Sequence, residues 1–191
     1  MTSLLPSAVV MMGAVLFVAD APSTSLDELD DRARALTSRR FVNDKQIRLW
    51  EETVAELAHA YPNDPISLYW AGVMLDRSSR PDEASARWND CIERIGTTSE
   101  LRLLSILADA ATLLGATELA AGNGQRAFDL ARKAMQANPQ KIEAYRLLLD
   151  AAFQLDRLDD AKKIIADRTE PVENARSEVL MARLTLLADR G

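Results

Sequence analysis

The stretch Ala108–Lys141 decides the fold, and it reads ADAATLLGATELAAGNGQRAFDLARKAMQANPQK. Its apolar residues recur at helical spacing on both sides of a glycine-rich break at 122–124. Asn138 and Pro139 stand at the exit of the second apolar segment. The stretch therefore predicts two helices joined by a tight turn.

The same pattern returns along the chain at a fixed period, which is about 34 residues and within the range typical of stacked repeats. Leu114 recurs as Leu148, and Ala127 recurs as Ala161, in each case one period later. The gap between Ala84 and Ala127 is one period plus nine residues. A fixed period of this size predicts an array of similar helix pairs, each burying its apolar face on the next.

The extra nine residues fall within Thr98 to Leu107, which reads TSELRLLSIL. The simplest placement is a first helix longer than usual, running from Ser99 to Ala121. Such a helix departs from the regular repeat at the middle of the array. We therefore expect the superhelical curve to be irregular there.

Local signals place the helix starts. Three pairs of residues have capping-box spacing, in which each side chain satisfies the other residue's free backbone N–H: Ser25 with Glu28, Asn43 with Gln46, and Thr97 with Glu100. Pro65 and Pro81 are expected at first helical positions, where the missing N–H costs nothing. We expect helices near residues 25–39, 43–60, 65–78, 81–95, 98–121, 124–137, 141–155, 158–168 and 171–189.

This pattern resembles the tetratricopeptide repeat family, whose signature is two helices in a period of about 34 residues. The copy 108–141 fits best. Two weaker copies begin at residues 65 and 142, and a degenerate first copy ends at residue 64. The last expected helix, 171–189, is either the first half of a fifth copy or a capping helix. The resemblance covers residues 26–190 and implies an all-α, right-handed solenoid of about four repeats plus a terminal helix. The repeat domain is then 25–191.

Composition supports a helical, soluble array and narrows its function. Hydrophobic residues make up 48% of the 191 residues and charged residues 27%, with only 7 Gly and 7 Pro. The formal net charge of −6 disfavours a general nucleic-acid role, because phosphate backbones are repelled. The single cysteine, Cys91, excludes an internal disulfide.

The N-terminal segment, residues 1–24, is expected to be a signal peptide or membrane anchor followed by a short linker. Leu4 to Ala19 is apolar and uncharged, and it is shorter than a membrane-spanning helix needs. Ala19 and Ala21 suit a signal peptidase, whereas a basic segment before the apolar run is missing and Pro22 hinders cleavage. Three interpretations stay open: a cleaved signal of an exported protein, an uncleaved membrane tether, or a buried helix of a cytoplasmic protein.

The residues that carry chemistry form no catalytic constellation. His59 stands alone near a helix end, and metal sites need several ligands. Cys91 occupies a place that favours a buried, inert thiol. The glycines of 122–124 lack the lysine of a phosphate loop and indicate a turn. We expect no enzyme activity, no cofactor and no metal.

The resemblance implies a concave groove lined by the first helix of each pair. The places that point into the groove are the second, fifth, ninth, twelfth and thirteenth of each repeat. These places hold Ile66, Tyr69, Val73, Asp76 and Arg77; Asp109, Thr112, Ala116, Leu119 and Ala120; and Glu143, Arg146, Asp150, Phe153 and Gln154. Trp70 is expected at the edge of the groove. Two plainer interpretations stay open: Tyr69 and Trp70 pack against the N-terminal helices, and Arg146 pairs with Asp150 one helical turn later.

These expectations favour a bacterial-type, non-enzymatic scaffold that binds a protein or peptide in its groove, either exported or tethered through residues 4–19. The groove lacks the Lys and Asn at the fifth and ninth places with which relatives clamp chaperone C-termini. The alternative is a structural or assembly module of a larger complex. For that alternative, residues 187–191 stop where a second helix normally follows, and the last helix is expected to self-associate or dock on another subunit.

Overall fold

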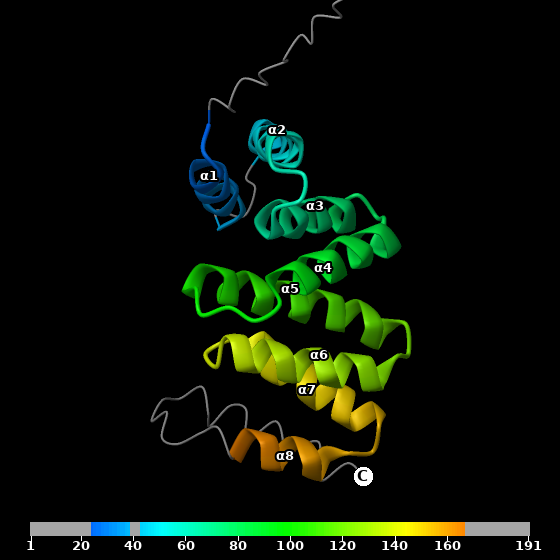
Figure 1. Ribbon diagram of the computed structural model, residues 1–191. Helices are drawn as coiled ribbons and strands as arrows, with labels where there is room; N and C mark the ends of the chain where they lie inside the picture. The colour runs from blue at the N-terminus through cyan, green and yellow to red at the C-terminus, as the bar shows by residue number, and fades with distance from the viewer. Residues whose placement is uncertain (1–23, 39–42, 167–191) are drawn as a thin grey trace, which may run out of the picture.

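The computed structural model describes residues 24–38 and 43–166, and every regular element in this part is an α-helix. Eight helices follow one another as pairs stacked along one axis (Figure 1). Their bounds are α1 Leu26–Ser38, α2 Asp44–Ala60, α3 Pro65–Arg77, α4 Pro81–Ile95, α5 Leu101–Ala120, α6 Gly124–Ala137, α7 Ile142–Gln154 and α8 Leu158–Ala166. The predicted all-α class is confirmed. The apolar segment 4–19 and the predicted helix 171–189 lie outside the described residues.

Two predicted capping pairs are formed where expected. The backbone N–H of Glu28 donates to Ser25 Oγ at 3.3 Å, and that of Ser25 donates to Glu28 Oε2 at 3.1 Å. The backbone N–H of Gln46 donates to Asn43 Oδ1 at 3.1 Å. The two helices expected to begin with proline, α3 and α4, do so.

The third predicted capping box is wrong. The backbone N–H of Glu100 donates to the hydroxyl of Thr98 at 3.1 Å, so a local turn replaces the bond expected from Thr97. Helix α5 consequently begins at Leu101 rather than near residue 98. It still has 20 residues, against 13 in α3 and 13 in α7, so the longer first helix predicted from the nine extra residues is confirmed.

The backbone repeats in step with the sequence at the turn inside each pair. Ser79, Gly122 and Asp156 all have positive φ, at 59°, 84° and 55°. Their spacing is one period plus nine residues and then one period, as in the sequence repeat. Each is followed by a residue whose N–H bonds a carbonyl five positions back: Arg80 to Leu75, Asn123 to Glu118, and Arg157 to Ala152. This arrangement ends one helix and starts the next within a few residues.

Close helix contacts explain the glycines of the repeat. A β-carbon on Gly72 would lie 2.4 Å from Nε1 of Trp88, and one on Gly115 would lie 2.4 Å from Cδ2 of Leu147. Neither distance is sterically possible, so only glycine permits these approaches without a shift. Ala127 is fully buried in α6, as its predicted place at a helix crossing requires.

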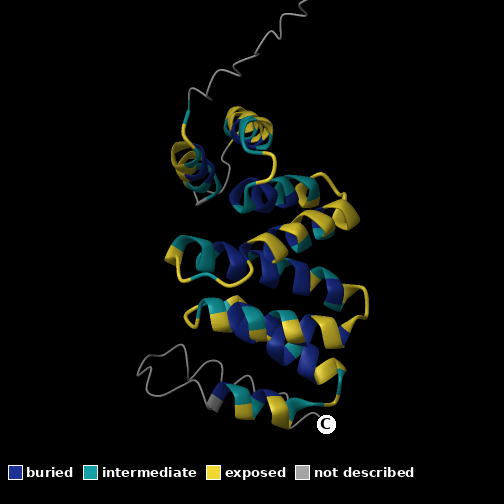
Figure 2. Cartoon of the chain, viewed as in Figure 1, coloured by how far each residue is buried: buried dark blue, intermediate teal, exposed yellow. Residues whose placement is uncertain are grey.

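A continuous apolar core runs through the stack, with exposed residues at the turns and along the outer sides of the helices (Figure 2). Helix α5 lies at its centre and contacts α3, α4, α6 and α7. In the described part of the chain, α5 is also the one helix long and apolar enough to cross a membrane. Its packing against four helices accounts for that apolar composition, because the core helix of an array can be as long and apolar as a membrane-spanning helix.

Candidate protein-binding surface

The side of α3, α5 and α7 that carries the groove places is called here the inner face. Helix α5 packs directly on α3 and on α7, so the first helices of successive pairs meet on this side. Among the described helices, α4, α6 and α8 have no comparable packing on one another. This asymmetry is what a curved array requires if its first helices lie on the inside of the curve.

The α3 part of the inner face is closed. Tyr69 is 9% exposed and Trp70 is 3% exposed, and their rings meet edge to face at 5.0 Å. The Trp70 ring also stands edge-on to Trp50, at 6.4 Å between centroids. Ile66, at the second place of the repeat, is buried as well. These aromatic rings pack inside the protein, as the plainer interpretation of the sequence had it, and the expectation that they line an open groove is not met in this conformation.

A buried carboxylate ties this closed part together. Asp30 of α1 is fully buried and accepts a hydrogen bond from Trp70 Nε1 at 2.7 Å. It also accepts from Arg34 Nε at 3.0 Å, and from Arg102 Nε and Nη2 at 3.0 and 2.6 Å. Arg102 pairs in addition with Asp27. We call these five residues the Asp30 cluster; it joins α1, α3 and the first turn of α5.

The pKa values in this part follow from burial and charge. Burial favours the neutral form of Asp30, but hydrogen bonds from Trp70, Arg102 and Arg34 more than offset it, so the Asp30 pKa is lowered. Burial, with the nearby Asp109 carboxylate, raises the pKa of the Tyr69 hydroxyl. Asp30 is therefore a charged anchor at neutral pH, while Tyr69 stays neutral.

The end of α3 carries the remaining predicted residues of that helix. Val73 is half-buried, whereas Asp76 and Arg77 are exposed. The Arg77 guanidinium lies over the Trp50 ring at 5.4 Å, so this side chain is directed toward α2. Val73 and Asp76 are therefore the predicted residues at the end of α3 that remain accessible on the inner face.

On α5, the predicted polar residues are engaged and the small ones are more accessible. Thr112 is 9% exposed, and its hydroxyl donates to the Ala108 carbonyl at 2.7 Å, within the same helix. Asp109 pairs with Lys141, at the start of α7, at 2.5 Å. Ala116 and Ala120 are exposed. The second half of α5 therefore presents methyl groups on the inner face, with little side-chain bulk.

On α7, three predicted residues form one stripe. Arg146, Asp150 and Phe153 follow one another at helical spacing, so they lie on one side of the helix. Arg146 is exposed, Asp150 is half-buried, and Phe153 is 53% exposed. Arg146 forms no ion pair with any residue in the described ranges, so the predicted alternative of an Arg146–Asp150 pair is not formed.

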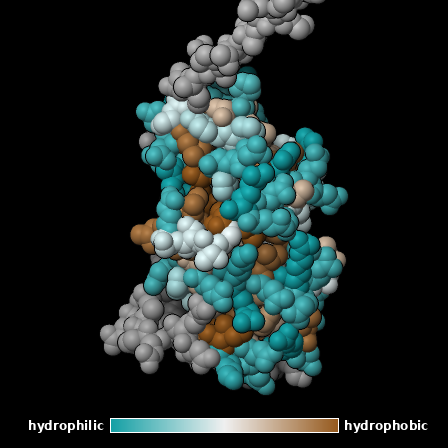
Figure 3. All heavy atoms as spheres, viewed as in Figure 1, coloured by the Kyte–Doolittle hydropathy of each residue, from teal (hydrophilic) through white to brown (hydrophobic). Residues whose placement is uncertain are grey.

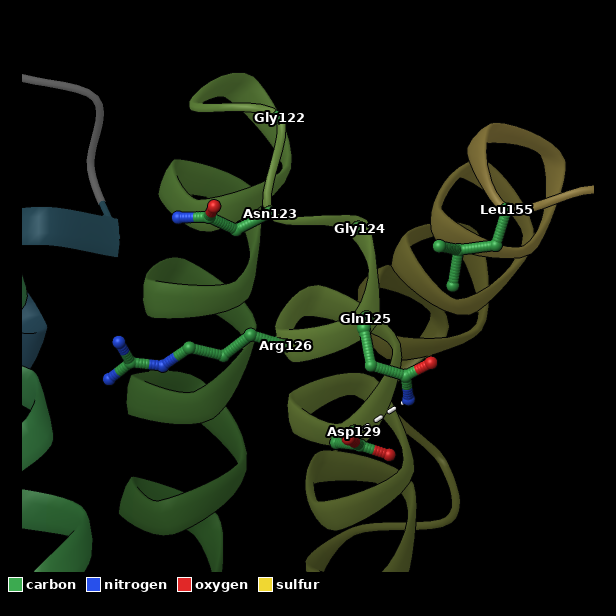
Figure 4. Close-up of a pocket in the computed structure, with 7 residues that line it drawn as sticks. All are labelled: Gly122, Asn123, Gly124, Gln125, Arg126, Asp129 and Leu155. Carbon is green, nitrogen blue, oxygen red and sulfur yellow. Dashed lines mark hydrogen bonds between the residues drawn. The ribbon is translucent and has the colours of Figure 1, made fainter.

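An open depression of about 600 Å³ lies at the turn between α5 and α6, beside the end of α7 (Figure 4). Its lining residues are Gly122, Asn123, Gly124, Gln125, Arg126, Asp129 and Leu155. The polar groups are bonded to neighbours: Asn123 and Arg126 reach Glu118 at 2.7 and 2.8 Å, and Gln125 reaches Asp129 at 3.1 Å. Gly122 lies in the turn, as predicted, and Gly124 is the first residue of α6, so the depression is a by-product of the turn.

The lone titratable residues have the roles their types suggested. His59 is exposed on α2. Cys91 is buried, and burial, with the Asp64 charge, raises its pKa to about 12, so the thiol is protonated at neutral pH. No group of three or more His, Cys, Asp or Glu side chains within residues 24–38 and 43–166 is placed to hold a metal ion.

The sequence does not single out Asp30 and Arg102, which hold the closed part of the inner face. Asp30 belongs to an acidic run typical of a helix start, and Arg102 belongs to the nine extra residues. Exposed Leu101 and Leu49, at 83% and 43%, were also missed. Apolar residues reach the surface in separate patches with hydrophilic side chains between them (Figure 3).

Comparison with known families agrees with this architecture. The family model described as tetratricopeptide repeat matches residues 118–184, from the last turn of α5 onward. The matched family, the helix pairs and the regular recurrence of the turns together support a tetratricopeptide-repeat protein. Such repeats generally mediate contacts between proteins and generally act without catalysis. A comparison with curated proteins gives no match.

Proposed function

We propose that this chain is a non-enzymatic scaffold that binds a protein or peptide segment on the inner face of α5 and α7. The proposal rests on one observation: Phe153 is a large aromatic residue that stays 53% exposed on a first helix, at a place where the family contacts its partners. Of the Phe, Tyr and Trp side chains within the described residues, only that of Phe153 is exposed, and aromatic residues are frequent anchors of interfaces.

The surroundings of Phe153 suit a bound segment. Arg146 lies two turns away on the same side of α7 and has no ion pair in the described chain. Ala116 and Ala120, on the neighbouring α5, are exposed and small. An aromatic anchor, a cation and a shallow strip of methyl groups together offer a partner both apolar burial and one directional polar contact. We call these four residues the open part of the inner face.

The direct test is affinity capture with the chain from Ser23 onward, followed by identification of the bound protein. The double variant Arg146→Ala with Phe153→Ala should weaken binding of that partner by about tenfold or more, which corresponds to ~1.4 kcal/mol. Circular dichroism should remain that of the parent, because both side chains are exposed.

A matched control is Arg48→Ala with Leu49→Ala on α2, which likewise removes an exposed arginine and an exposed large apolar residue. It should leave binding unchanged. If the control weakens binding as much as the test variant, the open part of the inner face is not the site. If only removal of residues 171–191 abolishes binding, the end of the stack is the docking surface, and the assembly-module role replaces ours.

We also propose that residues 4–19 direct export of the chain or tether it to a membrane. The run is apolar and uncharged, and it precedes the first helix of the array. In a bacterium with a periplasm, the full chain should leave the cytosolic fraction, and removing residues 1–21 should return it there. A full-length product that stays in the cytosol would contradict the proposal.

A further inference from the structure

Helix α1 occupies the position over Trp70 that a partner would need in order to reach α3. Trp70 and Tyr69 hold groove places of the repeat, yet both are buried. The atom that meets the Trp70 indole N–H is a carboxylate oxygen of Asp30 in α1, at 2.7 Å. The N-terminal helix thus supplies from within the chain the kind of polar contact that a bound segment would make.

Helix α1 is held to α2 by apolar packing and to α3 and α5 by charged groups. Leu29 and Ala33 are buried in the core, and Leu26 and Leu36 pack against it partly buried, on the helix pair formed with α2. Its contact with α3 and α5 runs through Asp30, which accepts from Trp70 and Arg102, both far away in the sequence. A buried carboxylate is tolerated only while such donors compensate it, so losing one donor weakens the contact of α1 with α3 and α5.

The donor that completes the attachment comes from the nine extra residues. Arg102 lies in the first turn of α5, the part that lengthens this helix beyond its counterpart α3. Its side chain is 28% exposed, so water has access to the cluster from this side. The cluster also contains Arg34 Nη2, a buried donor with no hydrogen-bond partner among the described residues. The contact between α1 and α5 is therefore partly open to water at Arg102, and one of its buried donors lacks a hydrogen bond within the described residues.

We propose that α1 is a releasable cover of the α3 part of the inner face, latched by the contact of Arg102 with Asp30 and Asp27. Opening it makes Tyr69 and Trp70 accessible and extends the partner surface from α5 and α7 onto α3. This regulation rests on the proposed function. The opening itself is measurable without a partner, so failure of the cover and failure of partner binding are distinguishable.

The test is hydroxyl-radical footprinting of the full chain, which reads side-chain access one residue at a time. Arg102→Gln should raise labelling of Trp70 by about threefold or more, because local opening becomes easier. Trp88 of α4, which is 1% exposed, should keep its rate and serves as the internal reference. Arg80→Gln, which breaks an exposed ion pair with Glu83, is the matched control and should change neither rate.

A second variant separates release from misfolding. Asp27→Cys with Arg102→Cys, joined by a short bismaleimide, replaces the latch with a covalent link, while the buried Cys91 stays unmodified. Trp70 labelling should then return to the parent rate, and it should rise again when the link is omitted. Unchanged Trp70 labelling in Arg102→Gln, or an equal rise at Trp88, would overturn the proposal.

Discussion

The two parts of the inner face are built by different physics. Around α3, a charged cluster centred on Asp30 draws α1, α3 and α5 together and buries Tyr69 and Trp70. Between α5 and α7, close packing at Gly115 brings the helices together, and the side chains of Arg146 and Phe153 stay outside. Electrostatic closure can be undone locally, whereas close packing fails only with the fold. The same repeat therefore supports a cover at one end and a fixed surface at the other.

Among the substitutions that test this difference, Asp30→Ala should lower the free energy of unfolding most. It removes the acceptor of Trp70 and the counter-charge of Arg102 and Arg34 together. We expect a loss of about 3 kcal/mol, the lower end for breaking a buried pair, because both arginines can turn toward water. Denaturant unfolding measures the loss. Hydrogen exchange should place it in α1 and α3, and an equal loss of protection in α6 and α7 would contradict the local character of the cluster.

Substitutions of Gly72 in α3 and Gly115 in α5 should change the free energy of unfolding by a smaller amount, and to different extents. In Gly72→Ala the new methyl group meets the indole ring of Trp88, which is fully enclosed and cannot move aside. We expect a loss of about 1–3 kcal/mol there. In Gly115→Ala the clash is with the end of the Leu147 side chain, which can change rotamer, and alanine favours helix by about 0.5–1 kcal/mol.

The net change for Gly115→Ala should therefore be smaller than that for Gly72→Ala, and thermal melts of the two variants measured side by side decide it. Equal losses would show that the α5–α7 contact is as rigid as the α3–α4 contact.

Acid should weaken the charged part alone. The pKa of Asp30 is lowered in the folded state, so its contribution is complete above the unfolded value of about 3.9 and is lost as the pH falls through the folded value. The stability difference between the parent and Asp30→Ala should be constant from neutral pH down to about pH 5 and should narrow below about pH 4. Unfolding curves across this range measure it; a gap that widens in acid would reverse the sign of the argument.

The smallest effect is expected from the exposed pair of Arg80 and Glu83. Both side chains are more than half exposed, at 55% and 57%. Water and salt screen such pairs, so Arg80→Gln should leave the melting temperature unchanged within error. A clear loss would show that the turn at residue 79 depends on this pair, and that charge matters more broadly in the N-terminal half than the Asp30 cluster alone explains.

Most of the fold follows from the sequence because its determinants are local. Capping pairs, prolines and the periodic recurrence of small and apolar residues place the helices, and Gly72 and Gly115 mark the close contacts. Ser79 and Asp156 were not predicted to take positive φ, because neither is glycine and the turn imposes the conformation. The failed capping box at Thr97 reflects competition from the adjacent Thr98 hydroxyl.

The candidate site was harder to predict, because its state depends on contacts between distant residues. Family places identified Arg146 and Phe153, which the structure leaves exposed, and Tyr69 and Trp70, which it buries. Nothing local to Tyr69 indicates that a carboxylate of α1 and an arginine of α5 close over that region. The nine extra residues indicated an irregular repeat, but they did not indicate that Arg102 within them pairs with Asp30.

Footprinting of the unmodified chain tests the division of the inner face most directly. Phe153, Tyr69 and Trp70 all hold inner-face places, and each is labelled by hydroxyl radicals in proportion to its access. We predict that Phe153 is labelled readily, while Tyr69 and Trp70 are protected nearly as well as the fully buried Trp88. Labelling of Tyr69 and Trp70 at the rate of Phe153 would show that the α3 part is open and that the Asp30 cluster does not close it.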